Sequence, residues 1–217
     1  MKISYEIERL LQYAYKHGLV KKLDVIPCRN SLLDLFNVDS PYTGEIKEEI
    51  PEKPTEILDN IIDYGNEIGM LENNSDTFRD LLDAKIMGLL MARQSEVAND
   101  FWKTDRDRGL ETATNEYYYL SKKSNYIRED RISRNLYWKT NTDYGELEIT
   151  INLSKPEKDP KAIAAARSSK ENKYPECFLC LENVGYAGRV DHYARQNHRV
   201  IPLRIAGKDW YFQYSPY

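Results

Sequence analysis

Up to about residue 120, apolar residues recur every three or four positions, which is typical of helices that bury one face. The spacing is clearest at Ile7, Leu10, Leu11 and Ala14, at Ile57, Ile61, Ile62 and Ile68, and at Phe78, Leu81, Leu82, Leu89 and Leu90. We expect Ser4 to cap the first of these helices, Gly18 to end it and Ser75 to cap the third. Residues 95–123 continue the helical pattern as one or two polar helices.

Two breaks interrupt this helical pattern. Ser31 with Asp34 three residues later reads as a capping box that opens a short turn over residues 32–36. Residues 38–54 contain three prolines and a glycine among acidic residues, which predicts a loop.

Beyond Asn125 the pattern changes to alternation of apolar and polar residues. Leu136 and Trp138, followed by residues 147–153, predict an antiparallel hairpin with one buried face. Residues 198–205 and 210–214 predict a second hairpin that turns at Gly207. Between the two hairpins, Pro160 suits the first position of a short alanine-rich helix over residues 159–167.

These elements predict an α+β fold in two parts. Residues 1–124 form a helical N-terminal region, and residues 125–217 form the first part of a sheet-containing domain. The last predicted strand is barely complete at Tyr217. Because an unpaired strand edge invites aggregation, we expect further strands beyond this residue.

Composition narrows the class of protein. The 217 residues are 41% hydrophobic and 30% charged, which is a globular mixture. Apolar runs are far shorter than the roughly 20 residues that a membrane helix needs. The N-terminus reaches an acidic residue by Glu6 and has no signal-peptide core, so a cytoplasmic protein is expected. A net charge of −4 provides no general attraction for nucleic acid.

Cys177 and Cys180 have a spacing typical of metal or redox sites, and His192 and His198 follow them. The run Cys-x2-Cys-x11-His-x5-His is close to a zinc finger. Glycines occur where a finger needs a continuous helix, and the acidic chain lacks a basic face for nucleic acid. A thioredoxin-like redox pair is also disfavoured, because Cys177 does not lead from a strand into a helix.

A longer match surrounds the cysteines. Residues 177–189 read Cys-Phe-Leu-Cys-Leu-Glu-Asn-Val-Gly-Tyr-Ala-Gly-Arg. This run resembles the Cys-Phe-Leu-Cys-x-x-Asn-Val-x-x-x-Gly segment of galactose-1-phosphate uridylyltransferases. Residues 126–132, 145–156, 194–203 and 210–217 resemble the second type of this family, from Gram-positive and related bacteria, which also has a helical N-terminal extension.

The resemblance implies an antiparallel half-barrel sheet of the histidine-triad superfamily and an enzyme of galactose metabolism. Family members exchange a uridylyl group between UDP-glucose and galactose 1-phosphate, releasing glucose 1-phosphate and UDP-galactose, and are often homodimers. The nucleophile is a histidine in a His-x-His motif, and imidazole is both a good nucleophile and, once phosphorylated, a good leaving group. None of His17, His192 and His198 stands in such a pair. We therefore expect the nucleophile outside this sequence, and no turnover by this chain.

The same resemblance implies binding residues for a UDP-sugar. Phe178, Tyr186, Ser215, Pro216 and Tyr217 fall where the family lines the uridine, and an aromatic ring offers a flat apolar plate to a pyrimidine. A basic and amide-rich stretch suits a pyrophosphate: Arg189, Arg195, Asn197, His198 and Arg199. For the residues that line the uridine, the alternative is core packing. For the basic stretch, the alternative is a solvated loop without a ligand.

Further basic residues and a metal are also implied. Lys155 and Lys158 lie near the position where first-type enzymes have basic residues that reach the UDP-sugar. Cys177 and Cys180 match two ligands of the structural zinc in first-type enzymes. They provide half a site unless His192 or His198 contributes, and two inert thiols are the alternative.

Two other functions are also compatible with the sequence. One is a UDP-sugar or dinucleotide phosphorylase of the same superfamily. The other is a non-enzymatic interaction module with a zinc-stabilised sheet.

Overall fold

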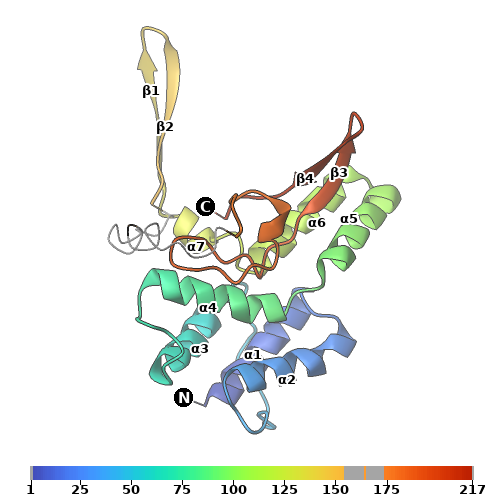
Figure 1. The fold of residues 1–217 in the computed structure, drawn as a ribbon, viewed down its shortest axis with the longest axis vertical. Helices are drawn as coiled ribbons and strands as arrows, with labels where there is room; N and C mark the ends of the chain where they lie inside the picture. Colours follow the sequence, from blue (N-terminus) through green and yellow to red (C-terminus); the bar gives the residue numbers. More distant parts are fainter. Residues whose placement is uncertain (1, 154–163, 165–173, 217) are drawn as a thin grey trace.

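Helices form the first part of the chain and two β-hairpins follow them (Figure 1). This computed structural model describes residues 2–153, 164 and 174–216. The helices are α1 (Ile3–Lys16), α2 (Val25–Leu35), α3 (Thr55–Glu67), α4 (Asp76–Leu89), α5 (Gln94–Arg108), α6 (Leu110–Lys123) and α7 (Glu129–Ile132). The strands are β1 (Leu136–Thr142), β2 (Gly145–Ile151), β3 (Ile201–Ile205) and β4 (Lys208–Phe212), and 3-10 turns lie at Lys22–Asp24 and Leu181–Asn183.

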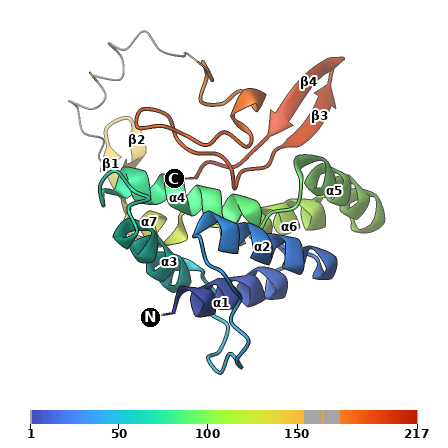
Figure 2. The same ribbon diagram turned by 60° about the horizontal axis from the view of Figure 1, so that its bottom comes forward.

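The main hydrophobic core lies between α1, α2, α3 and α4. The periodic positions predicted from the sequence provide it: Ile7, Leu10, Ile57 and Ile61 are fully buried. Figures 1 and 2 show α1, α2 and α3 on one side of α4 and residues 177–199 on the other. Helix α4 therefore separates the helical core from the segment that contains the predicted site.

The predicted helix ends are partly confirmed. Gly18 follows α1 with a φ of +74°, as expected of a glycine that ends a helix. Ser75 directly precedes α4, although its side chain makes no capping bond. The caps predicted at Ser4 and Ser31 are wrong, because both residues lie inside helices. The Ser31 hydroxyl donates to the Pro27 carbonyl at 3.0 Å, a bond to the preceding turn that hydroxyl residues make within helices.

The first hairpin has the predicted pairing but not the predicted burial. Leu136 faces Ile151 and Trp138 faces Ile149 across the β1–β2 ladder. The hairpin projects away from the helices (Figure 1), and every residue of β1 is exposed. The expectation of a buried face is therefore wrong for this structure, because no described element packs on the apolar side.

The second hairpin packs onto the helices. Ile201 pairs with Phe212 and is fully buried. It joins Val97 and Phe101 of α5 and Tyr117 of α6 in a second, smaller core. This contact fixes the chain on both sides of residue 200.

The α+β class with a helical N-terminal region is confirmed. The strands described form two separate two-stranded sheets, so the half-barrel sheet stays a prediction. The division at residue 124 also stays a prediction, and all of the alanine-rich segment except Ala164 lies outside the described residues. Within the described ranges, no helix has the length and apolar character to cross a membrane.

Replacing Ile61 by alanine tests the main core. This side chain is fully buried, so the variant should lose about 2–5 kcal/mol of unfolding free energy in denaturant titrations. Ile68, at the end of the same helix, is 45% exposed, and its alanine variant should stay within about 0.5 kcal/mol of the parent. Equal losses would contradict the placement of α3.

Candidate functional site

Residues 177–199, called here the site loop, fold back on themselves as a tight hairpin. The Gly185 amide donates to the Arg195 carbonyl at 3.0 Å, and the Arg195 amide donates to Tyr186 at 2.8 Å. Reciprocal bonds of 2.8 and 3.0 Å join Arg189 and His192 nearer the tip. This ladder brings Tyr186 and Arg195, two predicted site residues, side by side.

Two glycines allow the site loop to fold closely. A Cβ atom on Gly88 of α4 would lie 2.9 Å from the carbonyl oxygen of Gln196. Gly188 has a φ of +84°, and a Cβ there would lie 2.6 Å from the Ala194 amide nitrogen. Both distances are shorter than side chains tolerate, so the loop can lie against α4 only with glycine at these positions.

Arg195, Asn197 and His198 of the site loop are buried beside Tyr126. The His198 ring stacks on Tyr126, with centroids 4.1 Å apart and planes at 21°. The Arg195 guanidinium lies 5.3 Å above the same Tyr126 ring and donates to its hydroxyl. Asn197 donates to the Ser124 carbonyl at 3.0 Å. Three predicted ligand-binding residues therefore join the site loop to the segment that follows α6.

His198 is held neutral in this cluster. Burial, with Arg195 and Arg199 nearby, lowers its pKa to about 3. Its Nε2–H donates to Gln213 of the chain end at 2.9 Å, and its buried Nδ1 has no partner. Burial also raises the pKa of Tyr126 to about 12. At neutral pH the stacked pair therefore carries no charge.

The three predicted arginines bind different protein groups. Arg199 donates to the backbone carbonyls of Ala92, Gln196 and His198 at 2.7–2.9 Å, and burial lowers its pKa to about 10. Arg189 pairs with Asp191 at 2.6 Å and donates to the Tyr174 carbonyl and the Tyr186 hydroxyl. Together with Arg195 on Tyr126, these contacts do not assemble a shared pyrophosphate clamp.

An aromatic group lies nearer the cysteines. Phe178 is 45% exposed and stacks on His192, with centroids 4.4 Å apart and planes at 14°. Tyr186 meets the same imidazole edge-on at 5.3 Å, and His192 Nε2 donates to Asn183 at 2.6 Å. Phe178 thus has one face supported by a ring, a geometry that suits a stacking plate.

The chain end closes over the buried cluster. The Pro216 carbonyl accepts from the Arg128 amide at 3.0 Å, and Ser215 beside it is exposed. Pro216 lines a hollow of about 30 Å³ with Tyr126, Arg195 and Asn197. That volume suits one water molecule and not a nucleotide. Tyr217, Lys155 and Lys158 lie outside the described residues.

Cys177 and Cys180 lie next to each other in an open turn. The Cys180 thiol donates to Cys177, which lowers the pKa of Cys177. Among the residues described, no group of three or more potential ligands could hold a metal ion, and His192 and His198 are directed to Asn183 and Gln213. A complete four-ligand zinc site is therefore not formed by the described side chains, and bound zinc stays a prediction.

Several residues of this region were not predicted. Tyr126 lies in a segment that carried the family resemblance, and Asn183 is the asparagine of the cysteine motif, so both had a signal. Gln213 also lies in a resembling segment, residues 210–217, but its contact with His198 arises only from folding. Ser124 lies in no such segment, and its contact with Asn197 likewise arises only from folding.

Comparison with known proteins gives a consistent result. A family described as "Galactose-1-phosphate uridyl transferase, N-terminal domain" matches residues 21–199. The chain is 58% identical over 214 residues to the galactose-1-phosphate uridylyltransferase of Caldanaerobacter subterraneus, covering 99% of this chain and 41% of that protein. The Bacillus subtilis protein of the same name is 44% identical over 220 residues, covering 100% of this chain and 42% of its own length. No solved structure matches.

These matches identify a nucleotidyltransferase family and the part of it that is present. The chain belongs to the galactose-1-phosphate uridylyltransferase family and contains its N-terminal domain. It spans about two fifths of the length of the curated relatives that it matches, 41% of one and 42% of others.

Replacing Gly88 by alanine tests the contact between α4 and the site loop. In an open helix this change adds about 0.5–1 kcal/mol of stability. Here it should cost about 1–3 kcal/mol, because the new methyl group meets Gln196 backbone. Denaturant titration shows whether the substitution raises or lowers the free energy of unfolding. Lys85→Ala, at an exposed position of the same helix, should change stability by less than about 0.5 kcal/mol.

The neutral state of His198 predicts a pH dependence. Its folded pKa of about 3 lies below the ordinary 6.5, so the unfolded chain binds more protons as pH falls between these values. Stability present above pH 6.5 is therefore lost on acidification, by up to about 2 kcal/mol at pH 5. His198→Gln should lack this component in titrations at pH 7.5 and 5.0. His17→Gln should retain it and lose only the separate component of His17, whose pKa burial also lowers. An identical pH slope in parent and His198→Gln would contradict the assignment.

Proposed function

We propose that the complete protein transfers a uridylyl group from UDP-glucose to galactose 1-phosphate, and that this chain supplies part of its nucleotide-binding region. The observation that carries the proposal is the family match over residues 21–199, together with 58% identity to a relative of that name. The contacts of the site loop support a role in binding rather than in bond making.

The transfer proceeds in two steps through a histidine. An imidazole nitrogen attacks the α-phosphorus of UDP-glucose, and the bond to glucose 1-phosphate breaks. A phosphate oxygen of galactose 1-phosphate then attacks the same phosphorus, which releases the imidazole and forms UDP-galactose. Each step exchanges one P–O or P–N bond for another, so no oxidant or reductant is needed.

The three histidines of this chain are poor candidates for that nucleophile. His17, His192 and His198 are all buried. His17 is bonded to Tyr119 and the Pro51 carbonyl, and the other two to Asn183 and Gln213. An attacking imidazole needs access to the phosphorus, so we place the nucleophile outside these 217 residues.

Among the predicted uridine-lining residues that the structure describes, Phe178 has the geometry that suits stacking on uracil. Its ring is supported from one side by His192, which fixes its orientation before a ligand arrives. A supported ring loses little freedom on stacking, so the contact favours binding. Arg189, on the same loop, makes its bonds near the surface and would have to exchange them to reach a phosphate.

The longest polypeptide encoded by the same reading frame should exchange label between UDP-glucose and galactose 1-phosphate. Inorganic phosphate supplied in place of galactose 1-phosphate should give no UDP and no glucose 1-phosphate. Turnover with phosphate alone would instead identify a phosphorylase. Stoichiometric zinc without any affinity for UDP would indicate an interaction module, and would overturn the proposal.

Phe178→Leu tests the stacking plate in that polypeptide. Loss of the ring should weaken UDP-glucose binding about tenfold, seen as a raised KM with little change in kcat. Leu179→Ala, at the neighbouring and more exposed position, is the matched control and should leave KM unchanged. Equal KM values for parent and Phe178→Leu would show that Phe178 does not contribute to UDP-glucose binding.

A further inference from the structure

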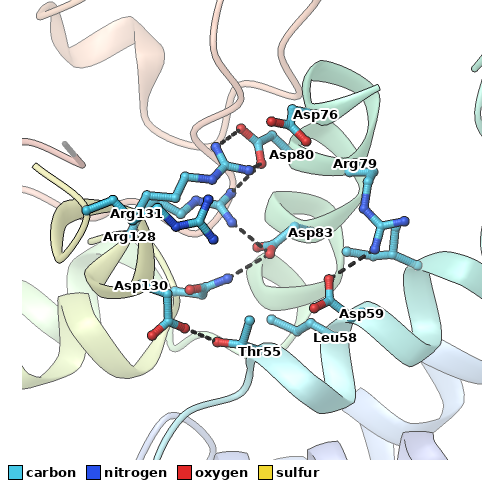
Figure 3. A pocket seen from close by; sticks show the side chains of 13 residues that line it. Thr55, Leu58, Asp59, Asp76, Arg79, Asp80, Asp83, Arg128, Asp130 and Arg131 are labelled. Atoms are coloured by element: carbon cyan, nitrogen blue, oxygen red, sulfur yellow. Dashed lines mark hydrogen bonds and ion pairs between the residues drawn. The ribbon is translucent and has the colours of Figure 1, made fainter. Parts of the chain in front are cut away.

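A polar cavity of about 190 Å³ lies between α3, α4 and the segment around α7 (Figure 3). Four arginines and five aspartates line it, so the lining carries one net negative charge. No residue of the site loop borders this cavity. The cavity is therefore distinct from the site loop, although Asp80, Asn125 and Arg128 also border the small hollow beside Pro216.

Ion pairs hold the walls of the cavity in place. Arg131 binds both carboxylate oxygens of Asp80, at 2.6 and 2.8 Å. On the opposite side, Arg79 binds Asp59 at 3.0 Å and Asp63 at 2.5 Å. Two-point pairing of this kind fixes both groups in direction, so the polar atoms are arranged before any ligand binds.

One oxygen of the Asp83 carboxylate has no hydrogen-bond donor in this cavity wall. Asp83 is 4% exposed, and Arg128 and Asn125 both donate to its Oδ2, at 2.8 and 2.7 Å. Its buried Oδ1 accepts no hydrogen bond. Figure 3 shows this carboxylate among the residues that line the cavity. A buried acceptor without a donor costs free energy, so a ligand that donates a hydrogen bond to this oxygen would be favoured.

The outer part of the cavity offers both kinds of polar group. Asp76 and Arg134 are exposed there, and neither side chain makes a hydrogen bond or ion pair within the described part of the chain. A fitting ligand must therefore donate to Asp83 and Asp76 and accept from Arg134. Hydroxyl groups do both.

Other ligand classes fit less well. No potential metal-binding group of three side chains occurs among the described residues, which disfavours a divalent cation. No aromatic ring lines the cavity to stack on a nucleobase, and its volume is below the 300–1,000 Å³ typical of drug-sized ligands. From these contacts we propose that the cavity binds a single sugar ring or a similar small polyol, with one hydroxyl donating to Oδ1 of Asp83.

Titrating the 217-residue chain with galactose, glucose and myo-inositol, followed by amide chemical shifts, tests the proposal. At least one of them should give saturable shifts at Asn125 and Asp83. Galactose 1-phosphate as a further arm shows whether a phosphate strengthens binding through Arg134. Saturable shifts with Mg²⁺ or free arginine but with none of the polyols would overturn the proposal.

Asp83→Asn and Asp76→Asn provide the matched test. The first replaces the unpartnered oxygen or its neighbour by an NH₂ group, and should weaken polyol binding about tenfold or more. Asp76→Asn, at an exposed position in the first turn of α4, should cost at most about 1 kcal/mol of stability and should weaken polyol binding several-fold. Asp107→Asn, at an exposed position of α5 that does not border the cavity, is the control and should bind as the parent does.

Burial raises the pKa of Asp83, and a proton held on Oδ1 would satisfy this oxygen without a ligand. Absence of saturable shifts with all of the polyols would overturn the proposal. The proposal does not depend on the uridylyl transfer proposed above: a chain that binds polyols but whose longer form fails to exchange label would leave this inference standing.

Discussion

Residues 195–200 run through the interior between α4, α6 and the second hairpin, and the polar groups of a buried segment must find partners within the protein. Tyr117 donates to the Arg199 carbonyl at 2.6 Å, and Gln94 forms two bonds with Val200 at 2.6 and 2.9 Å. Gly88 provides the space on α4 for this segment to pass. Positions of the site loop and of the second hairpin both depend on these contacts.

The same constraint explains why much of the fold, but less of the site, could be predicted. Helical periodicity reports which face is buried, so the core positions Ile7 and Ile61 and the pairing of both hairpins follow from the sequence. The burial predicted for one face of the β1–β2 hairpin is wrong. Alternation of apolar and polar residues shows that a face can pack, but it does not show whether another element covers that face. The cap at Ser31 failed because a hydroxyl residue is compatible with a helix interior when it bonds to the preceding turn. Ser4 is the second residue of α1, and its buried hydroxyl has no hydrogen-bond partner among the described residues.

Within the candidate site, the resemblance indicated a segment but could not predict the contacts of its side chains. Arg199 binds backbone carbonyls and Arg195 a tyrosine, and these long-range partners leave no trace in the local pattern. Phe178, by contrast, remains partly exposed and supported by His192, as a binding plate requires. The polar cavity around Asp83 had no signal in the sequence, because its walls come from three separate segments.

We propose that this chain contributes to binding and that bond making falls to residues outside these 217. The most direct test is to incubate the longer polypeptide with UDP-glucose alone, trap the covalent intermediate and locate the uridylyl group by peptide mass spectrometry. The account predicts one modified histidine outside residues 1–217. A uridylyl group on His17, His192 or His198 would contradict it.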